Sequence, residues 1–239
     1  MGGHRFQTKP IYQQLCDALT ERIASGEWKS GTALPNEGEL AREFNVSPGT
    51  MRKALGLMER EHLLTRHPGR GTFVSDQGSG ELSVRFTNLR TPDGNRVAAP
   101  VSSSTTTQGT ANETERTRLE LREQAPVYRV HRVRTYADRP FIVEEAVMPA
   151  ALFPGLTNET DPSDRIVVLA RHHGILLSKA EEMVSIGSAS PEVAKLLEIE
   201  PSTPILVLDR VVRAIDGRPV EWRIGLCDLG ELRYLAETN

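Results

Sequence analysis

Apolar residues in the first third of the chain recur at helical spacing. From Ile11 to Ile23 they return every four residues, which predicts an amphipathic helix with one buried face. The segment LPNEGELAREF predicts a second helix, because Asn36 and Glu39 have the spacing of a capping box. These two patterns indicate the start of a small helical domain.

The stretch VSPGTMRKALGLMER, residues 46–60, predicts a third helix. Ser47 is a suitable N-cap, and Pro48 fits the first turn because a residue there has no intrahelical acceptor for an N–H. The expected buried stripe is Val46, Met51, Leu55 and Met58. Thr50, Arg52 and Lys53 would then point outward, as the polar residues of a DNA-reading helix do.

A basic hairpin follows the three helices. The run LLTRHPGRGTFV contains two short β-like segments joined by a turn at residues 67–71 with a cationic tip. Three helices and such a hairpin make a winged helix-turn-helix, in which the N-terminal end of the third helix enters the major groove. The expected DNA-contacting residues are Ser47, Thr50, Arg52 and Lys53 on the helix, and Arg66, Gly69 and Arg70 on the wing.

The rest of the chain contains an internal repeat at an offset of 78 residues. PVYRVHRVRTYAD at 126–138 matches PILVLDRVVRAID at 204–216. Each copy follows a short charged helical segment and precedes a turn and a second β-like run. One strand–turn–strand unit used twice favours an α+β domain with an antiparallel sheet.

Alternation within the first copy places two arginines on one face of its strand. Arg132 and Arg134 lie two residues apart, roughly 6–7 Å at the rise of a strand. Two half-buried guanidiniums repel each other and require an anion or carboxylates nearby. Glu144 and Glu221 are the internal candidates, and a ligand phosphate, sulfonate or carboxylate is the external one. A structural Arg–Glu network and a ligand site both remain open from the residues alone.

Charge and cysteine content narrow the class of protein. The net charge of −3 divides into +2 over residues 1–75 and −5 over the remainder, as expected if one end faces phosphate. Cys16 and Cys227 are far apart and offer neither a disulfide framework nor metal-ligand spacing, so no metal or other cofactor is expected. The absence of a signal-peptide pattern and of a long apolar run predicts a cytoplasmic protein without membrane contact.

Residues 9–74 resemble the DNA-binding domain of GntR-type bacterial transcription regulators. The most specific pieces are LPNEGELAREFNVSPGTMRKAL and the wing GRGTFV. Relatives usually carry Arg at the position of Gly38, and Arg or a similar polar residue at that of Pro48, for base or phosphate contact. Their absence here predicts a divergent operator with fewer direct base contacts.

Residues 81–239 resemble the UTRA effector-binding domain of the HutC-like branch, which has a chorismate-lyase-like fold. The segment RVHRVRTYADRPFIVEEAVMPAALFPGL carries much of this resemblance. The resemblance implies that Arg132 and Arg134 hold an anionic group, that Glu144 and Glu221 hold hydroxyls or amines, and that Phe86 and Thr87 line the same pocket. Cys227 stands where sugar-phosphate-binding relatives often have Tyr.

Together these features predict a winged helix-turn-helix domain at 1–75, a linker at 76–82 and an effector-binding and dimerisation domain at 83–239. The expected function is a homodimeric repressor released from a double-stranded DNA operator by an anionic effector such as a sugar phosphate or sulfonated sugar. The alternatives are a chorismate-lyase-like enzyme acting on a carboxylated molecule and an architectural DNA binder. The missing nucleophile motif argues against the first, and the arginine pair against the second.

Overall fold

The computed structural model describes residues 9–76, 85–97, 99–156 and 165–236. It divides into two compact units, Met1–Leu82 and Ser83–Asn239. Among the described residues, no helix is both long and apolar enough to cross a membrane.

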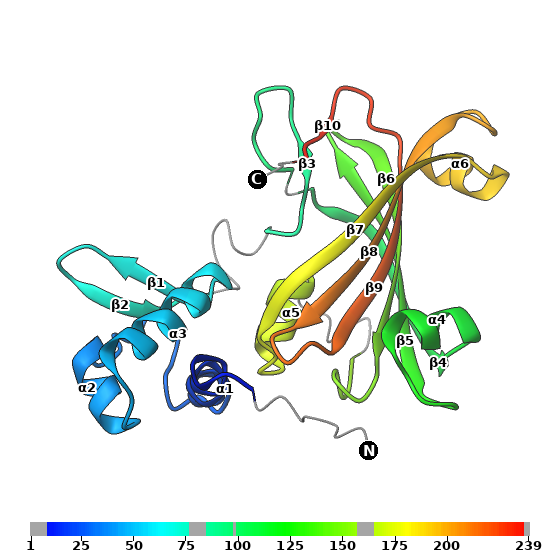
Figure 1. Ribbon diagram of the computed structural model, residues 1–239. Coiled ribbons are helices and arrows are strands. Elements are labelled where there is room, and N and C mark those ends of the chain that lie inside the picture. The colour runs from blue at the N-terminus through cyan, green and yellow to red at the C-terminus, as the bar shows by residue number, and fades with distance from the viewer. Residues whose placement is uncertain (1–8, 77–84, 98, 157–164, 237–239) are drawn as a thin grey trace, which may run out of the picture. The chain divides into compact units, whose positions relative to one another are not determined.

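The first unit has three helices and a hairpin (Figure 1). They are α1 (Ile11–Ala24), α2 (Glu37–Glu43), α3 (Pro48–Arg60), β1 (Leu64–His67) and β2 (Gly71–Val74). The capping box of α2 is confirmed, with Asn36 Oδ1 accepting from the Glu39 amide at 2.9 Å. Ser47 caps α3 and Pro48 opens it, as predicted. The apolar stripe of α3 is buried at Met51, Leu55 and Met58, whereas Val46 is half-buried.

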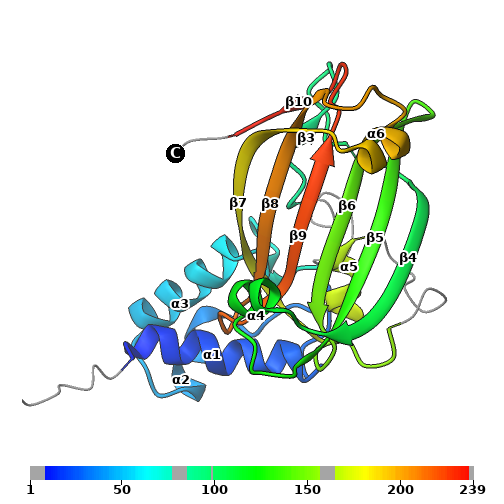
Figure 2. The ribbon, with the colours of Figure 1, turned by 90° about the vertical axis from the view of Figure 1, so that its right-hand side faces the viewer.

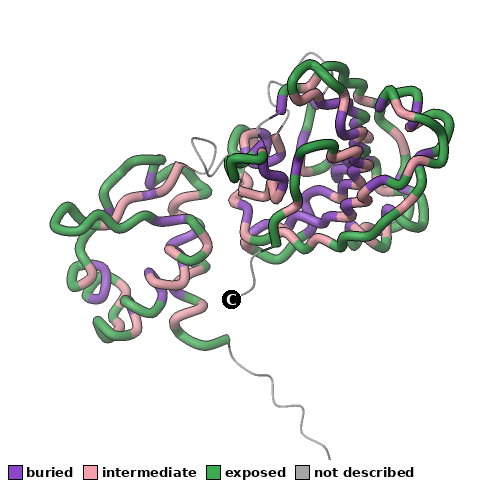
Figure 3. Tube along the Cα trace, turned by 90° about the horizontal axis from the view of Figure 1, so that it is seen from above, coloured by how far each residue is buried: buried purple, intermediate pink, exposed green. Residues whose placement is uncertain are grey.

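The second unit is built on one six-stranded antiparallel sheet in the order β4-β5-β6-β9-β8-β7. Its strands are β4 (Val101–Thr110), β5 (Pro126–Tyr136), β6 (Arg139–Pro149), β7 (Leu177–Ser188), β8 (Pro204–Ala214) and β9 (Pro219–Cys227). Buried positions concentrate along these strands, while the loops at the rim are exposed (Figure 3). The antiparallel α+β architecture is therefore confirmed.

The predicted repeat corresponds to two halves of this sheet, β4-α4-β5-β6 and β7-α6-β8-β9, which meet at β6 and β9. α4 (Glu113–Leu119) and α6 (Pro191–Leu197) each end at a left-handed glutamate, Glu120 and Glu198, 78 residues apart. The strand register shifts directly after Arg134 in one half and directly after Val212 in the other, at the same offset. The duplication thus extends from sequence to backbone detail.

The two faces of the sheet are covered differently. α4 and α6 lie on one face, and α5 (Ile166–His172) lies on the other (Figure 2). At one end of the α5 face, a two-stranded ribbon pairs β3 (Leu89–Arg90) with β10 (Arg233–Tyr234). An apolar cluster under the ribbon contains Leu89, Val97, Phe141, Ile142, Leu208, Cys227 and Leu232. This end of the sheet also holds a cluster of buried arginines and glutamates.

Candidate functional site

The exposed end of α3 and the hairpin carry the basic side chains expected to contact DNA. Arg52, Lys53 and Arg70 are exposed. Gly69, at φ +72°, has the left-handed conformation that lets the hairpin turn tightly, because glycine adopts it without steric cost. These positions form one part of the candidate nucleic-acid surface.

Local contacts hold the remaining helix residues. Ser47 Oγ accepts from the Thr50 amide at 3.2 Å and lies 2.8 Å from Thr50 Oγ1, so both hydroxyls engage the helix N-terminus. Lys53 Nζ lies 3.9 Å from the centroid of the Tyr12 ring on α1, an arrangement that anchors the ammonium by a cation–π contact.

Glu37, on α2, joins the recognition helix to the wing. Its Oε2 accepts from Arg52 Nε at 2.9 Å, and its Oε1 accepts from Arg66 Nη2 at 3.0 Å. Arg66 Nε also lies 3.5 Å from Glu59. The carboxylate of Glu37 therefore places two cations from different elements side by side, a contact that sequence spacing alone did not indicate.

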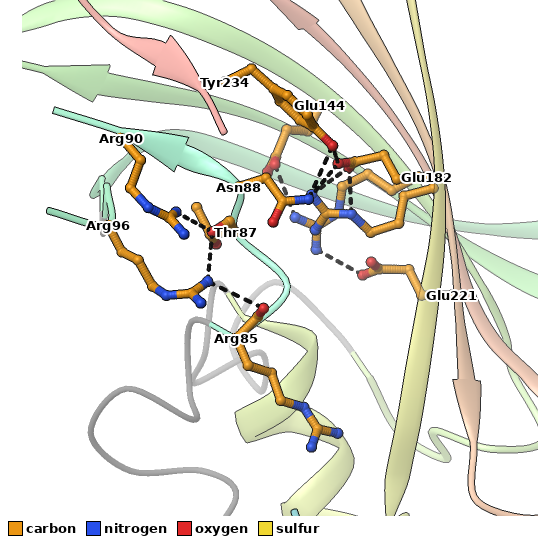
Figure 4. A network of polar contacts seen from close by, with 11 residues as sticks. Arg85, Thr87, Asn88, Arg90, Arg96, Glu144, Glu182, Glu221 and Tyr234 are labelled. Atoms are coloured by element: carbon orange, nitrogen blue, oxygen red, sulfur yellow. Dashed lines mark hydrogen bonds and ion pairs between the residues drawn. The ribbon is translucent and has the colours of Figure 1, made fainter. Parts of the chain in front are cut away.

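In the second unit, arginines and glutamates from three strands, β5, β6 and β9, form a buried cluster on the α5 face. Glu144 accepts from Arg134 Nε at 2.7 Å and from Arg223 Nη1 at 2.9 Å, and Glu221 accepts from Arg223 Nη2 at 2.8 Å. Arg132 is 3% exposed and lies opposite Glu144 in the β5–β6 register. Arg134, Glu144 and Glu221 thus belong to one network through Arg223, and Arg132 lies beside it. Figure 4 shows Glu144 and Glu221.

Electrostatics in this cluster favour the charged forms. Burial alone would raise the pKa of Glu144, but Arg223 and Arg134 outweigh it and hold that pKa well below its usual range. Burial opposes the charge of Arg223, yet Glu144 and Glu221 raise its pKa. Glu144 therefore stays an acceptor-only carboxylate, which suits charge pairing rather than proton transfer.

A cavity opens beside the cluster. Its volume open to the centre of a water molecule is about 70 Å³. The charged residues that line it are Arg134, Glu144, Arg165, Glu182, Arg210 and Arg223. Phe86 and Thr87 also line the cavity, as expected. Arg132 and Glu221 are buried and, in the part of the chain that the structure describes, do not line it.

Several of these residues were not selected from the sequence. Arg210 is the repeat partner of Arg132, and Glu182 pairs with it at 2.6 Å across the β7–β8 register. Arg223 shares a strand face with Glu221, two residues away. Alternation could have indicated Arg223, but pairing of Glu182 with Arg210 required the strand order.

Cys227, the departure noted in the sequence, is buried in the apolar cluster under the ribbon. Burial raises the pKa of its thiol, so the thiol remains protonated. Among the described residues, no group of three or more His, Cys, Asp or Glu is placed to hold a metal ion.

Comparison with known proteins gives two family matches that share the chain between them. Residues 11–74 match the gntR family of bacterial regulatory proteins, and residues 103–230 match the UTRA domain. The mannosyl-D-glycerate transport/metabolism system repressor MngR of Escherichia coli is 30% identical over 90% of both chains. The histidine utilization repressor of Klebsiella aerogenes is 27% identical over 84% of this chain and 83% of its own length.

A solved structure extends the likeness to the second unit. The ligand-binding domain of a GntR-family transcriptional regulator from Bordetella bronchiseptica is 26% identical, with a TM-score of 0.57, over 64% of this chain and 96% of that one. The helix-turn-helix with its basic wing and the duplicated sheet with its arginine cluster are the structural counterparts of the two family matches. The chain therefore belongs to the GntR family of bacterial regulatory proteins, in the HutC-like branch that joins a DNA-binding domain to a UTRA domain.

Proposed function

We propose that the protein is a ligand-responsive repressor that an anionic small molecule, such as a sugar phosphate or sulfonated sugar, releases from a double-stranded DNA operator. The observation that carries this proposal is the arginine-lined cavity on the α5 face of the sheet. The seven residues assigned from sequence to helix α3 and the wing would contact the operator.

The charge balance at the cavity supports an anionic ligand. Four lining arginines face two lining glutamates, which leaves two guanidiniums more than carboxylates. Paired guanidinium forks suit phosphate, sulfonate and carboxylate groups, which accept two parallel N–H bonds. The cavity therefore has the electrostatic character that a ligand of about two negative charges would complement.

Two buried polar atoms in the cluster support a ligand or ordered water there. Glu221 Oε1 and Arg223 Nε have no hydrogen-bond partner among the described residues. An unsatisfied buried polar group costs about 1–3 kcal/mol. A donor such as an ordered water would satisfy the first, and an acceptor on a ligand or a water would satisfy the second, since Arg223 lines the cavity.

The relatives are consistent with this chemistry. MngR is named for a mannosyl-D-glycerate system, and glycerate is a carboxylate anion. The Bordetella bronchiseptica domain is described as ligand-binding. By analogy, the second unit of this chain would sense a small molecule, and the first would bind DNA.

We further propose a homodimer whose two heads address a pseudo-palindromic operator, because two-fold protein symmetry matches two-fold operator symmetry. Effector and DNA would then be reciprocally linked. A coupling of about 1–3 kcal/mol is typical of such linkage.

The experiment that tests this function follows DNA release and ligand chemistry together. DNA sites selected by the full chain from a random pool serve as operator, and glucose 6-phosphate, glucosamine 6-phosphate and mannosyl-D-glycerate serve as probes. We expect at least one anion to lower the bound DNA fraction while remaining chemically intact. Turnover of a probe would support the lyase-like alternative. If neither these probes nor other anionic metabolites release DNA, the proposal is contradicted.

A further inference from the structure

One carboxylate in the second unit joins the cavity to the ribbon at its rim. Glu182 Oε1 accepts from Arg210 Nε at 2.7 Å and from Arg210 Nη2 at 2.6 Å. Glu182 Oε2 accepts from Tyr234 Oη at 2.6 Å and from Asn88 Nδ2 at 3.1 Å. Figure 4 shows Asn88 and Tyr234 converging on Glu182 from one side. Oε1 of Glu182 thus binds an arginine that lines the cavity, and Oε2 accepts hydrogen bonds from two residues at the ribbon.

Strand pairing and several hydrogen bonds hold the ribbon together. Leu89 pairs with Tyr234 in the β3–β10 register, and the Leu235 amide donates to the Asn88 carbonyl at 2.9 Å. Arg90 and Arg96 both donate to the carbonyl of Thr87, at 2.8 and 2.9 Å. These contacts connect residues 87–96 with residues 233–235, so Asn88 and Tyr234 belong to one hydrogen-bonded ribbon.

The ribbon is also the part of the second unit that follows the interdomain connection in sequence. Phe86, Thr87 and Leu89 line the cavity, and all three stand within a few residues of the segment that leads from the DNA-binding head.

In the internal repeat, only one of the two equivalent positions carries this carboxylate. Arg132 and Arg210 are equivalent at the offset of 78, and so are Ser104 and Glu182. Arg132 lies opposite Ser104 in the β4–β5 register, and Arg210 lies opposite Glu182 in the β7–β8 register. The carboxylate therefore occurs in the half whose edge strand contacts the ribbon, and a hydroxyl takes its place in the other half.

We propose that Glu182 is a positioning residue that fastens the ribbon to the cavity, and that an anion bound at Arg210 competes for this arginine and loosens the ribbon. This inference rests on the proposed function for the presence of the anion. An anion near Arg210 offers the guanidinium a second partner and repels Glu182, since both carry negative charge. Glu182 then holds Asn88 and Tyr234 less firmly, so that ligand binding changes the stability of the ribbon.

The first arm of the test measures the fastening without ligand, in the full chain. Hydrogen exchange is followed at the amides of Thr91, Val97 and Leu235, which bond within the ribbon. Tyr234→Phe and Glu182→Gln should each accelerate this exchange about tenfold, because each weakens a hydrogen bond to a charged group. Matched controls are Tyr136→Phe and Glu145→Gln, a partly buried tyrosine and an exposed glutamate, and both should exchange like wild type.

The second arm adds inorganic phosphate as the probe anion. In wild type, phosphate should raise the melting temperature and accelerate ribbon exchange. In Glu182→Gln, phosphate should still raise the melting temperature, but ribbon exchange should no longer respond. A purely structural role for Glu182 would leave the phosphate response of the ribbon intact.

The outcomes separate the inference from the proposed function. Unchanged ribbon exchange in Tyr234→Phe and Glu182→Gln overturns the fastening, whatever phosphate does. An equal phosphate response in wild type and Glu182→Gln, or no ribbon response in a wild type that phosphate stabilises, overturns the coupling. Absence of both the thermal shift and the ribbon response in wild type overturns the coupling and also counts against the anion site of the proposed function.

Discussion

In each unit, one carboxylate forms ion pairs with two arginines of the candidate functional site. In the head, Glu37 contacts Arg52 and Arg66, and in the sheet Glu144 contacts Arg134 and Arg223. The two arginines at Glu37 are 67% and 40% exposed, so phosphate groups of DNA can compete for them at small cost. The pair at Glu144 is buried, so removal of one partner leaves an uncompensated charge.

For the head, we predict that Arg52→Ala weakens binding to the selected operator more than tenfold at physiological salt. A specific arginine contact to a base contributes about 1–3 kcal/mol of discrimination. Fluorescence anisotropy with labelled operator measures the change. Lys29→Ala, an exposed cation outside α3 and the wing, is the control and should bind nearly as wild type does. An Arg52→Ala protein with unchanged affinity would remove this helix from the reading role.

For the sheet, we predict that Glu144 makes stability depend on pH in the acid range. Its folded-state pKa lies below the ordinary value of 4.5, so its contribution is complete above that value and is lost as pH falls below it. Urea denaturation between pH 7 and pH 3 measures this. Glu144→Gln should cost about 3–5 kcal/mol at pH 7 and flatten the acid dependence. A variant that keeps the wild-type slope below pH 4.5 would assign the acid loss to other groups.

The sequence predicted which face of a strand the arginines occupy better than it predicted which residues they contact. Alternation placed Arg132 and Arg134 on one face of β5, and both are buried there. The network around them depends on Arg223, which comes from the second half of the chain. Spacing within one strand cannot reveal which strand of the other half lies beside it, because strand order is a tertiary property.

Secondary-structure elements were likewise predictable where their signals are local, and not where they depend on residues far apart in the chain. The three helices and hairpin of the head and the two repeated hairpins were predictable, because periodicity, caps and turn residues are local signals. The ribbon of β3 and β10 was not predicted. Its two strands have two residues each and are more than 140 residues apart, so no local pattern marks them.

The duplicated helix ends give a prediction at the element scale. Glu120 and Glu198 have φ of 54° and 57°, a conformation that costs a residue with a side chain about 1–2 kcal/mol. Glu120→Gly and Glu198→Gly should each raise the free energy of unfolding by up to about 1 kcal/mol, because the strain exceeds the entropy that glycine adds.

Thermal denaturation of the two glycine variants measures the effect, and their similarity tests the structural equivalence of the two halves. Glu123→Gly is the control, since its backbone is not left-handed, and it should not be stabilised. Destabilisation at both Glu120 and Glu198 would contradict the strain argument.

For the whole molecule, the family match and the proposed function together predict assembly on two-fold symmetric DNA. Sedimentation equilibrium of the full chain should give twice the chain mass of 26.4 kDa at micromolar concentration. A selected operator should contain two similar half-sites in inverted orientation. A monomer bound to a single half-site would contradict the proposed assembly.

The proposed function depends on capture of an anionic small molecule by the arginine cluster of the second unit. The most direct measurement is a thermal-shift screen of anionic metabolites on wild type and on Arg134→Ala, with Arg139→Ala, an exposed arginine outside the cluster, as the control. We expect at least one anion to raise the melting temperature of wild type and of Arg139→Ala and to have little effect on Arg134→Ala. An anion that stabilises wild type and Arg134→Ala equally would contradict it.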